Sequence, residues 1–285
     1  MRIIVHLSDL HFGRVHKATM QPLVRQINAL KPHLVVVSGD LTQRARTAQF
    51  VEARRFLESL PKPQIVVPGN HDVPAYNLYK RFVEPLKKYR QHITEDLLPT
   101  YVDKETAVFG LNSSRSFTTK YGKLRERDVA QVCEKLTQLS TKVTKIVVCH
   151  HPFDLPPKHG KRDLIRRARS AMRAFAECEV DIILSGHLHQ SHTSHTAERY
   201  RIPGHSALIV QAGTAISNRY RGGALNSFNV LRLEHTKLVV QRFEWDVKSL
   251  CYTLAKAEEF TRSSEGWSPA KAASAKSEAN VQRRD

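Results

Sequence analysis

Five short segments of the chain place side chains that can bind metal ions directly after a run of apolar residues. They are Asp9-Leu10-His11, Gly39-Asp40, Gly69-Asn70-His71-Asp72, His150-His151 and Gly186-His187-Leu188-His189. Carboxylates, amides and imidazoles, with no cysteine among them, suit borderline divalent metals such as manganese, iron or zinc. Because the same pattern recurs five times, it predicts that these residues form a metal site.

The apolar runs that precede these segments have the character of buried β-strands. "RIIVHL", "HLVVVS", "QIVV", "KIVVC" and "DIILS" are short and rich in valine, isoleucine and leucine. Between them, apolar residues recur at helical spacing over residues 18–30 and 129–139, and more weakly over 50–60. This alternation predicts an α/β fold built from βαβ units, and the strand-rich segment 207–246 predicts an antiparallel meander near the end.

The predicted strands explain how ligands so far apart in the sequence could meet. The carboxyl ends of the strands in an open α/β sheet share one rim, so the five segments can converge on one crevice there. Gly39, Gly69 and Gly186 each precede a proposed ligand, where a residue without a Cβ allows a sharp turn and a close approach. In Asp9-x-His11 and His187-x-His189, two donors one residue apart point the same way and can bind neighbouring ions.

Taken in this order, the five segments resemble the signature of the calcineurin-like metallophosphoesterases, over roughly residues 1–235. The resemblance implies a four-layer αββα sandwich, in which two β-sheets are flanked by helices. It also implies two metal sites that share the carboxylate of Asp40. One ion would be held by Asp9, His11, Asp40 and His189, and the other by Asp40, Asn70, His150 and His187. His150 is chosen over its neighbour His151 because it is nearest the strand end, as in the family.

A pair of divalent ions predicts hydrolysis of a phosphoester. Two cations about 3.5 to 4 Å apart can hold a bridging hydroxide at neutral pH and stabilise an in-line displacement at phosphorus. The resemblance implies that His71 is no ligand and lies beside the leaving group, where it can act as a general acid. Asp72 is interpreted either as the residue that orients this ring or as a turn residue bonded to its own backbone.

The substrate is predicted to be an anionic phosphoester. Lysine and arginine outnumber aspartate and glutamate by 45 to 27, which gives a formal charge of +18. Arg115 in "LNSSR", and Arg219 and Arg221 in "SNRYRGG", are candidates for binding phosphate or are simply exposed charges. The basic segment 158–173 is either a surface helix with its apolar side on the core, or an overhang that contacts a lipid substrate or a membrane surface.

Four functions stay open at this level. The chain resembles bacterial cyclic nucleotide phosphodiesterases, which favours a small nucleotide substrate. The related UDP-2,3-diacylglucosamine pyrophosphatases are an alternative, although one branch of them carries arginine where His71 stands. A DNA-processing nuclease is supported by the charge but weakened by a short basic tail with one aromatic residue, Trp267. A non-catalytic metal-binding scaffold is opposed by the presence of His71 and of every expected ligand.

The remaining features concern the compartment and the chain ends. "MRIIVHLSDLH" fits neither a signal peptide nor a membrane span, which predicts a cytoplasmic protein. The four cysteines have no CxxC spacing and are expected to be reduced: Cys133, Cys149, Cys178 and Cys251. We expect a catalytic domain at residues 1–246 and a C-terminal extension at 247–285, disordered from about residue 262 because apolar periodicity is lost there.

Overall fold

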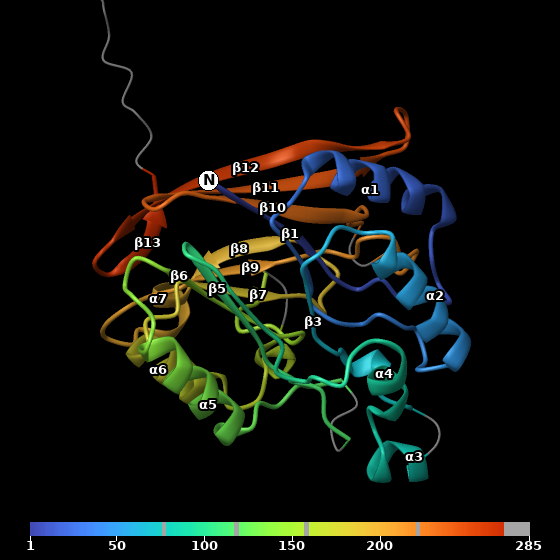
Figure 1. Cartoon of the computed structure of the whole chain (residues 1–285), viewed down its shortest axis with the longest axis horizontal. Coiled ribbons are helices and arrows are strands. Elements are labelled where there is room, and N and C mark those ends of the chain that lie inside the picture. Colours follow the sequence, from blue (N-terminus) through green and yellow to red (C-terminus); the bar gives the residue numbers. More distant parts are fainter. Residues whose placement is uncertain (76–77, 117–119, 157–159, 221–222, 271–285) are drawn as a thin grey trace, which may run out of the picture.

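The computed structural model describes residues 1–75, 78–116, 120–156, 160–220 and 223–270. Within these residues, two β-sheets lie face to face and helices cover their outer faces (Figure 1). The first sheet has the order β13-β12-β11-β10-β1-β2-β3. Its strands are β1 (Arg2–Leu7), β2 (Leu34–Val37), β3 (Gln64–Val66), β10 (Ser227–Leu233), β11 (Lys237–Asp246), β12 (Cys251–Ser263) and β13 (Gly266–Pro269).

The second sheet has the order β4-β5-β6-β7-β9-β8. Its strands are β4 (Thr100–Val102), β5 (Thr106–Gly110), β6 (Thr144–Val148), β7 (Ile182–Ser185), β8 (His192–His195) and β9 (Leu208–Gln211). β1, β2 and β3 are parallel to one another, and so are β5, β6, β7 and β9. The parallel strands of each sheet therefore end at a common edge, which is where the predicted ligands follow them.

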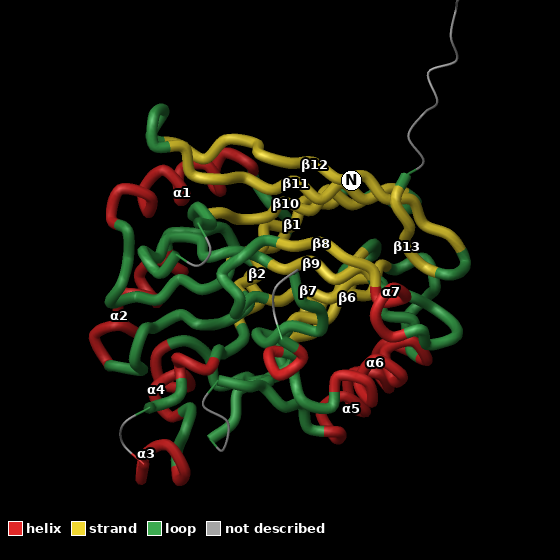
Figure 2. The backbone as a smooth tube through the Cα atoms, turned by 180° about the vertical axis from the view of Figure 1, so that it is seen from behind, coloured by secondary structure: helices red, strands yellow, loops and turns green. Residues whose placement is uncertain are grey.

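Helices cover the outer face of each sheet. α1 (Lys17–Leu30) and α2 (Thr47–Glu58) pack on the first sheet, and α5 (Glu126–Thr137) and α6 (Ala168–Glu177) on the second (Figures 1 and 2). The shorter helices are α3 (Leu78–Val83), α4 (Lys87–His92) and α7 (Thr196–Tyr200), with 3-10 turns at Asn70–Asp72 and Lys161–Asp163. The predicted four-layer αββα sandwich is confirmed, and the helices expected near 18–30, 50–60 and 129–139 are α1, α2 and α5.

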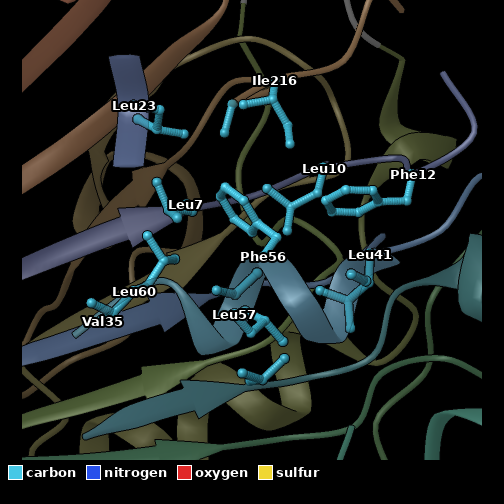
Figure 3. Packing of buried hydrophobic residues seen from close by; sticks show 14 of the residues in the cluster. Leu7, Leu10, Phe12, Leu23, Val35, Leu41, Phe56, Leu57, Leu60 and Ile216 are labelled. Atoms are coloured by element: carbon cyan, nitrogen blue, oxygen red, sulfur yellow. The ribbon is translucent and has the colours of Figure 1, made fainter. Parts of the chain in front are cut away.

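Alternation along the strands builds the layers. In β1, Val5 and Leu7 face α1 and α2, whereas Ile4 faces the second sheet. Figure 3 shows Phe56 and Leu57 of α2 directed toward side chains of the first sheet and of the loop after β1. A sheet whose two faces are both buried needs apolar residues at successive positions, which explains the continuous valine and isoleucine runs in the sequence.

The last part of the basic segment 158–173, from Ala168 onward, belongs to the surface helix α6. Ala168, Ala171, Met172 and Phe175 of α6 are buried in the cluster between this helix and the second sheet. The apolar side is therefore covered by the protein itself, and α6 exposes cations such as Arg169 and Arg173. Residues 158 and 159 of the segment lie outside the described residues.

Residues 247–269 were predicted to be an extension outside the domain, but in the structure they form part of the first sheet. β12 pairs with the whole of β11, from Lys237 opposite Thr261 to Asp246 opposite Cys251. β13 then pairs with β12, so the first sheet continues to Pro269. Along β12 only Tyr252 and Phe260 are buried, because most of its side chains face solvent. The strand consequently lacks the apolar pattern that the sequence interpretation required. Residues 271–285 lie outside the described residues.

Two smaller expectations also need correction. The antiparallel meander starts at β10 rather than near residue 207, because β9 joins the second sheet in parallel with β7. Cys133 and Cys178 are joined by a disulfide instead of being reduced, since α5 and α6 bring their Cα atoms to 5.4 Å. Cys149 and Cys251 are free thiols. Within the described residues, the helices are too short or too polar to cross a lipid bilayer.

Candidate metal centre

The structure brings all seven predicted metal ligands together where the strands end. Around the first position, His11 Nε2 lies 3.1 Å from His189 Nε2, 3.5 Å from Asp9 Oδ1 and 3.6 Å from Asp40 Oδ2. His189 Nε2 lies 3.3 Å from Asp9 Oδ1. Atoms that bind one ion at about 2 Å are separated from each other by roughly 3 Å. These four side chains, all buried, therefore have the spacing of one coordination shell.

A second group of ligand atoms surrounds His150 Nε2. This nitrogen lies 3.3 Å from Asp40 Oδ1, 3.2 Å from Asn70 Oδ1 and 3.3 Å from His187 Nδ1. The two carboxylate oxygens of Asp40 thus face different groups, Oδ2 the first and Oδ1 the second. This is the arrangement that a bridging carboxylate requires.

Backbone carbonyls fix the orientation of two ligand rings. Nδ1 of His150 donates to the carbonyl of Ser38 at 2.8 Å, and Nδ1 of His189 donates to the carbonyl of Arg219 at 2.7 Å. A carbonyl can only accept, so in the neutral ring the lone pair is on Nε2, which faces the ligand group. Such hydrogen bonds set the tautomer and ring position of metal-binding histidines in general.

The turns that carry the ligands are held in a conformation that is uncommon for residues with a Cβ. Five predicted ligands have positive φ: Asp9 (53°), His11 (48°), Asp40 (53°), His187 (74°) and His189 (58°). Aspartate and histidine tolerate this region better than most residues, and such backbone strain concentrates at functional sites. Gly39 also has a positive φ of 93°, and a Cβ on Gly69 would clash with the carboxylate of Asp40. These glycines allow two strand ends to approach each other closely.

The electrostatics of the group fit divalent cations. Asp9 Oδ1 is buried and accepts no hydrogen bond within the described residues. Burial by itself raises the pKa of Asp40, but His150 and His71 outweigh it and hold that pKa well below its usual value. Burial likewise disfavours charged His150, yet the carboxylate of Asp40 raises the pKa of the ring to about 9. A bound cation would replace that proton, because a ligand nitrogen must be deprotonated.

His71 lies beside the first group, with its ring centroid 4.9 Å from that of His11. Both of its ring nitrogens are engaged: Nδ1 donates to the carbonyl of Gln43 at 2.8 Å, and Nε2 accepts from Arg219 Nη1 at 2.9 Å. The backbone N–H of His71 donates to Asp40 Oδ1 at 2.8 Å. His71 is therefore a direct neighbour of the predicted ligands, and its role as an acid stays a prediction.

Asp72 has the turn role and not the ring-orienting one. Its carboxylate accepts hydrogen bonds from the backbone N–H groups of Gly69 at 2.9 Å, Leu41 at 3.1 Å and Thr42 at 2.8 Å. It thereby ties the turn after β3 to the loop after β2. The carbonyl of Gln43 orients the ring of His71 instead.

A cavity of about 270 Å³ opens onto both groups of ligands. Its lining residues are Asp40, Gln43, Arg44, Asn70, His71, Val73, Ala75, Arg81, Lys120, His187, His189 and Arg219. A hollow of about 310 Å³ near α2 and α4 contains none of the predicted ligands. The cavity at the metal centre lies just below the usual range for ligand pockets, about 300 to 1,000 Å³.

The candidate phosphate-binding arginines have different places. Arg219 lines the cavity and contacts His71. Arg115 is absent from the lining and instead bonds to the carbonyls of Lys123 and Asn112 in its own loop and to Asp128 of α5. Arg221 lies outside the described residues.

Sequence reasoning missed several residues of this site. The carbonyls of Ser38, Gln43 and Arg219 leave no side-chain signature, because any residue type can supply them. Arg81 and Lys120 come from segments without a motif, and only the fold brings them to the cavity.

The sequence is similar to those of known phosphoesterases. The family model described as calcineurin-like phosphoesterase matches residues 3–191. A glycerophosphodiester phosphodiesterase of Enterobacter lignolyticus (strain SCF1) is 29% identical over 164 residues, which are 54% of this chain and 58% of that protein. The 3',5'-cyclic adenosine monophosphate phosphodiesterase of Escherichia coli (strain K12) is 25% identical over 202 residues, 66% of this chain and 69% of that protein. The first match thus spans little more than half the length of that relative.

A solved structure shares the fold at very low sequence identity. The purple acid phosphatase PPD1 of yellow lupin (Lupinus luteus) superposes with a TM-score of 0.64 and 10% identity, over 90% of this chain and 53% of that one. This similarity supports the four-layer architecture alone.

Proposed function

Because the chain belongs to the calcineurin-like phosphoesterase family, we propose that it is a dinuclear metal-dependent enzyme that hydrolyses a phosphodiester or pyrophosphate bond. The observation that carries the proposal is the pair of ligand groups joined by the two carboxylate oxygens of Asp40. A divalent pair bound there would supply Lewis acidity and a hydroxide nucleophile at neutral pH.

These distances support two proposed ligand sets. Asp9, His11, Asp40 and His189 would hold one ion. Asp40, Asn70, His150 and His187 would hold the other. The mixture of imidazoles with few carboxylates favours manganese, iron or zinc over calcium or magnesium.

The proposed acid is His71, with Arg219 beside it. Arg219 donates to Nε2 of His71, which is the nitrogen that must carry a proton for the leaving oxygen. An anionic phosphoryl group is a stronger acceptor for a guanidinium than a neutral imidazole is. We expect Arg219 to turn to the phosphoryl group of a bound substrate. Nε2 of His71 is then free to take up a proton and to donate it to the leaving oxygen. The hydrogen bond to Gln43 keeps the ring aligned meanwhile.

A small nucleotide-type substrate such as a cyclic nucleotide is the favoured candidate. The cavity volume of about 270 Å³ suits a small phosphodiester, and one relative carries a cyclic nucleotide phosphodiesterase name. UDP-2,3-diacylglucosamine pyrophosphatase activity stays an alternative, although the apolar side of α6 is covered by the second sheet. A DNA-processing nuclease, a membrane contact and the cytoplasmic location stay predictions from sequence alone.

Hydrolysis of bis(p-nitrophenyl) phosphate by the manganese-loaded protein tests the proposal. We expect turnover that a chelator abolishes and that His71→Ala reduces. Full metal occupancy without turnover, unchanged by His71→Ala, would instead indicate a non-catalytic scaffold. A panel of cyclic nucleotides, nucleotide-sugar lipids and single-stranded DNA would then rank the substrate classes.

A further inference from the structure

Arg81 is a buried cation in the wall of the metal cavity. It belongs to α3, the short helix that lies near α4 at the lower edge of the molecule in Figure 1. Its relative exposure is 4%, and it lines the cavity together with His71 and Arg219. No motif in the sequence singles it out.

The charge of Arg81 has no carboxylate partner among the described residues. Its two recorded hydrogen bonds go to backbone carbonyls, from Nε to Ser116 at 2.6 Å and from Nη1 to Pro74 at 3.1 Å. A guanidinium has five N–H donors in a planar fork, so three take no part in these bonds. Burying a cation without a counter-ion costs several kcal/mol, and buried charges are therefore normally paired. An anion in the cavity would supply the missing partner.

Other cations reach the same cavity from separate segments. Arg44 follows β2, Lys120 follows β5, and Arg219 follows β9. Lys120 is already paired with Asp163 at 2.6 Å, which distinguishes it from Arg81.

The metal centre by itself provides for one anionic phosphoryl group. Two divalent ions would bring four positive charges, of which Asp9, Asp40 and the hydroxide nucleophile would neutralise three. The remainder suits the phosphoryl group that is attacked, and Arg219 stands beside it. A singly charged phosphodiester therefore leaves the guanidinium of Arg81 without an anion.

We propose that Arg81 binds a second anionic group of the substrate, so that the preferred substrate carries a further phosphate besides the phosphoryl group that is hydrolysed. This inference rests on the proposed phosphoesterase function. Within the small nucleotide-type substrates it favours those with two phosphoryl groups over a cyclic nucleotide, which carries one. The bonds to Ser116 and Pro74 hold the guanidinium in place, which favours bidentate recognition of phosphate.

A matched pair of chromogenic substrates tests the inference. The p-nitrophenyl ester of thymidine 5'-phosphate carries one anionic group, and its 3'-phosphorylated form carries two. In the manganese-loaded protein we expect kcat/KM to favour the second substrate by about tenfold or more, as one charge-assisted contact allows. Arg81→Met should remove most of that preference, and Arg81→Lys should keep part of it because the charge is retained.

Lys104→Met is the matched control. Lys104 is exposed in the turn between β4 and β5, at the opposite end of β5 from the metal centre, and its loss changes the net charge equally. This variant should keep the wild-type preference. An unchanged preference in Arg81→Met, or an equal loss of preference in Lys104→Met, would overturn the assignment.

A binding measurement separates this inference from the function itself. In metal-free protein, thermal stabilisation by thymidine 3',5'-bisphosphate and by a nucleoside diphosphate is compared with that by the monophosphates. We expect the doubly phosphorylated ligands to raise Tm more, and Arg81→Met to cancel the difference. If both ester substrates resist hydrolysis but this difference is present, the proposed function fails and the anion site stands. Equal shifts in wild type and Arg81→Met would reject the site.

Discussion

At the scale of single residues, the centre depends on which atom of each side chain faces inward. Carbonyl acceptors at Ser38 and Arg219 leave Nε2 of His150 and His189 for a metal. A backbone carbonyl also orients the ring of His71, whose Nδ1 donates to the carbonyl of Gln43. Main-chain carbonyls thus set which ring nitrogen of each histidine carries the proton. The sequence shows only that the residue is a histidine.

Replacement of His71 by alanine should separate catalysis from metal binding. We expect kcat for bis(p-nitrophenyl) phosphate to fall by about 10² to 10⁴, because a general acid contributes on this scale. Metal content should stay at the wild-type level, since both ring nitrogens of His71 are engaged elsewhere. Elemental analysis beside steady-state kinetics checks both statements, and loss of metal from the variant would make His71 a ligand.

The sequence predicted which side chains cluster at the strand ends, because each comes shortly after a strand, where spacing and residue type are both informative. That they bind metal stays a prediction. Sequence reasoning left the roles of Arg115 and Asp72 open, since those roles depend on which backbone groups the fold places nearby. It also passed over Arg81, because a lone arginine in a short helix has no pattern that distinguishes it from an exposed charge.

At the scale of elements, the loop after β6 is fixed by Asp154, which is 7% exposed. Its carboxylate contacts Arg199 of α7 and lies 3.5 Å from His192 Nε2 of β8. Burial acts to raise the pKa of Asp154, but the contacts with His192 and Arg199 outweigh it and hold that pKa well below its usual value. The carboxylate therefore stabilises the fold only while it is ionised.

Asp154→Asn tests this contribution. A carboxyl whose pKa is lowered on folding contributes stability above its unfolded pKa and loses it as the pH falls below about 4. We expect the variant to be less stable at pH 7 by about 1–3 kcal/mol, and the gap to wild type to narrow below pH of about 4. Urea unfolding across this pH range measures it. A gap that stays constant would show that the charge of Asp154 is not involved.

The strands after residue 246 were predicted poorly because their inward side chains are few and widely spaced. Trp267 of β13 is fully buried and packs between the sheets with Phe260, and Arg262 lies 5.9 Å from its ring centroid. Arg262 also bonds to buried Asp181 at the start of β7, at 2.9 Å. The end of the described chain therefore joins the two sheets rather than extending beyond them.

Trp267→Ala should lower the free energy of unfolding by about 3–5 kcal/mol, the usual cost of deleting a buried tryptophan. Leu254→Ala on β12 is the matched control, because that side chain is 52% exposed and its removal should change stability by less than about 0.5 kcal/mol. Denaturant unfolding of the two variants decides the point. If Trp267→Ala were as stable as Leu254→Ala, the packing of Trp267 would contribute little to the stability of the fold.

At the scale of the whole molecule, the sequence predicted the fold class but not the contacts between distant segments. The βαβ alternation of buried strands and amphipathic helices indicated α/β layers, because both signals are local. The pairing of β10 beside β1 joins residues more than 200 positions apart, and periodicity carries no information on such contacts. The disulfide between α5 and α6 was missed for the same reason.

The formal charge of +18 should appear in the kinetics as a dependence on salt. We expect kcat/KM for an anionic substrate to fall several-fold between about 0.02 and about 0.5 M sodium chloride, because screening weakens long-range attraction. The value for kcat should change much less, since the charges at the centre are buried. Steady-state kinetics over this range provides the test, and kcat/KM that is independent of salt would contradict it.

The central claim is that side chains after five strands bind two ions that share Asp40. Its most direct test is the metal content of the protein after loading with manganese and removal of unbound metal, for wild type and for Asp40→Ala. We expect about two ions per chain in wild type, as a two-metal site requires, and less than one in the variant, because one carboxylate serves both ions. A wild-type content of one ion or none, or a variant that keeps both, would contradict the account.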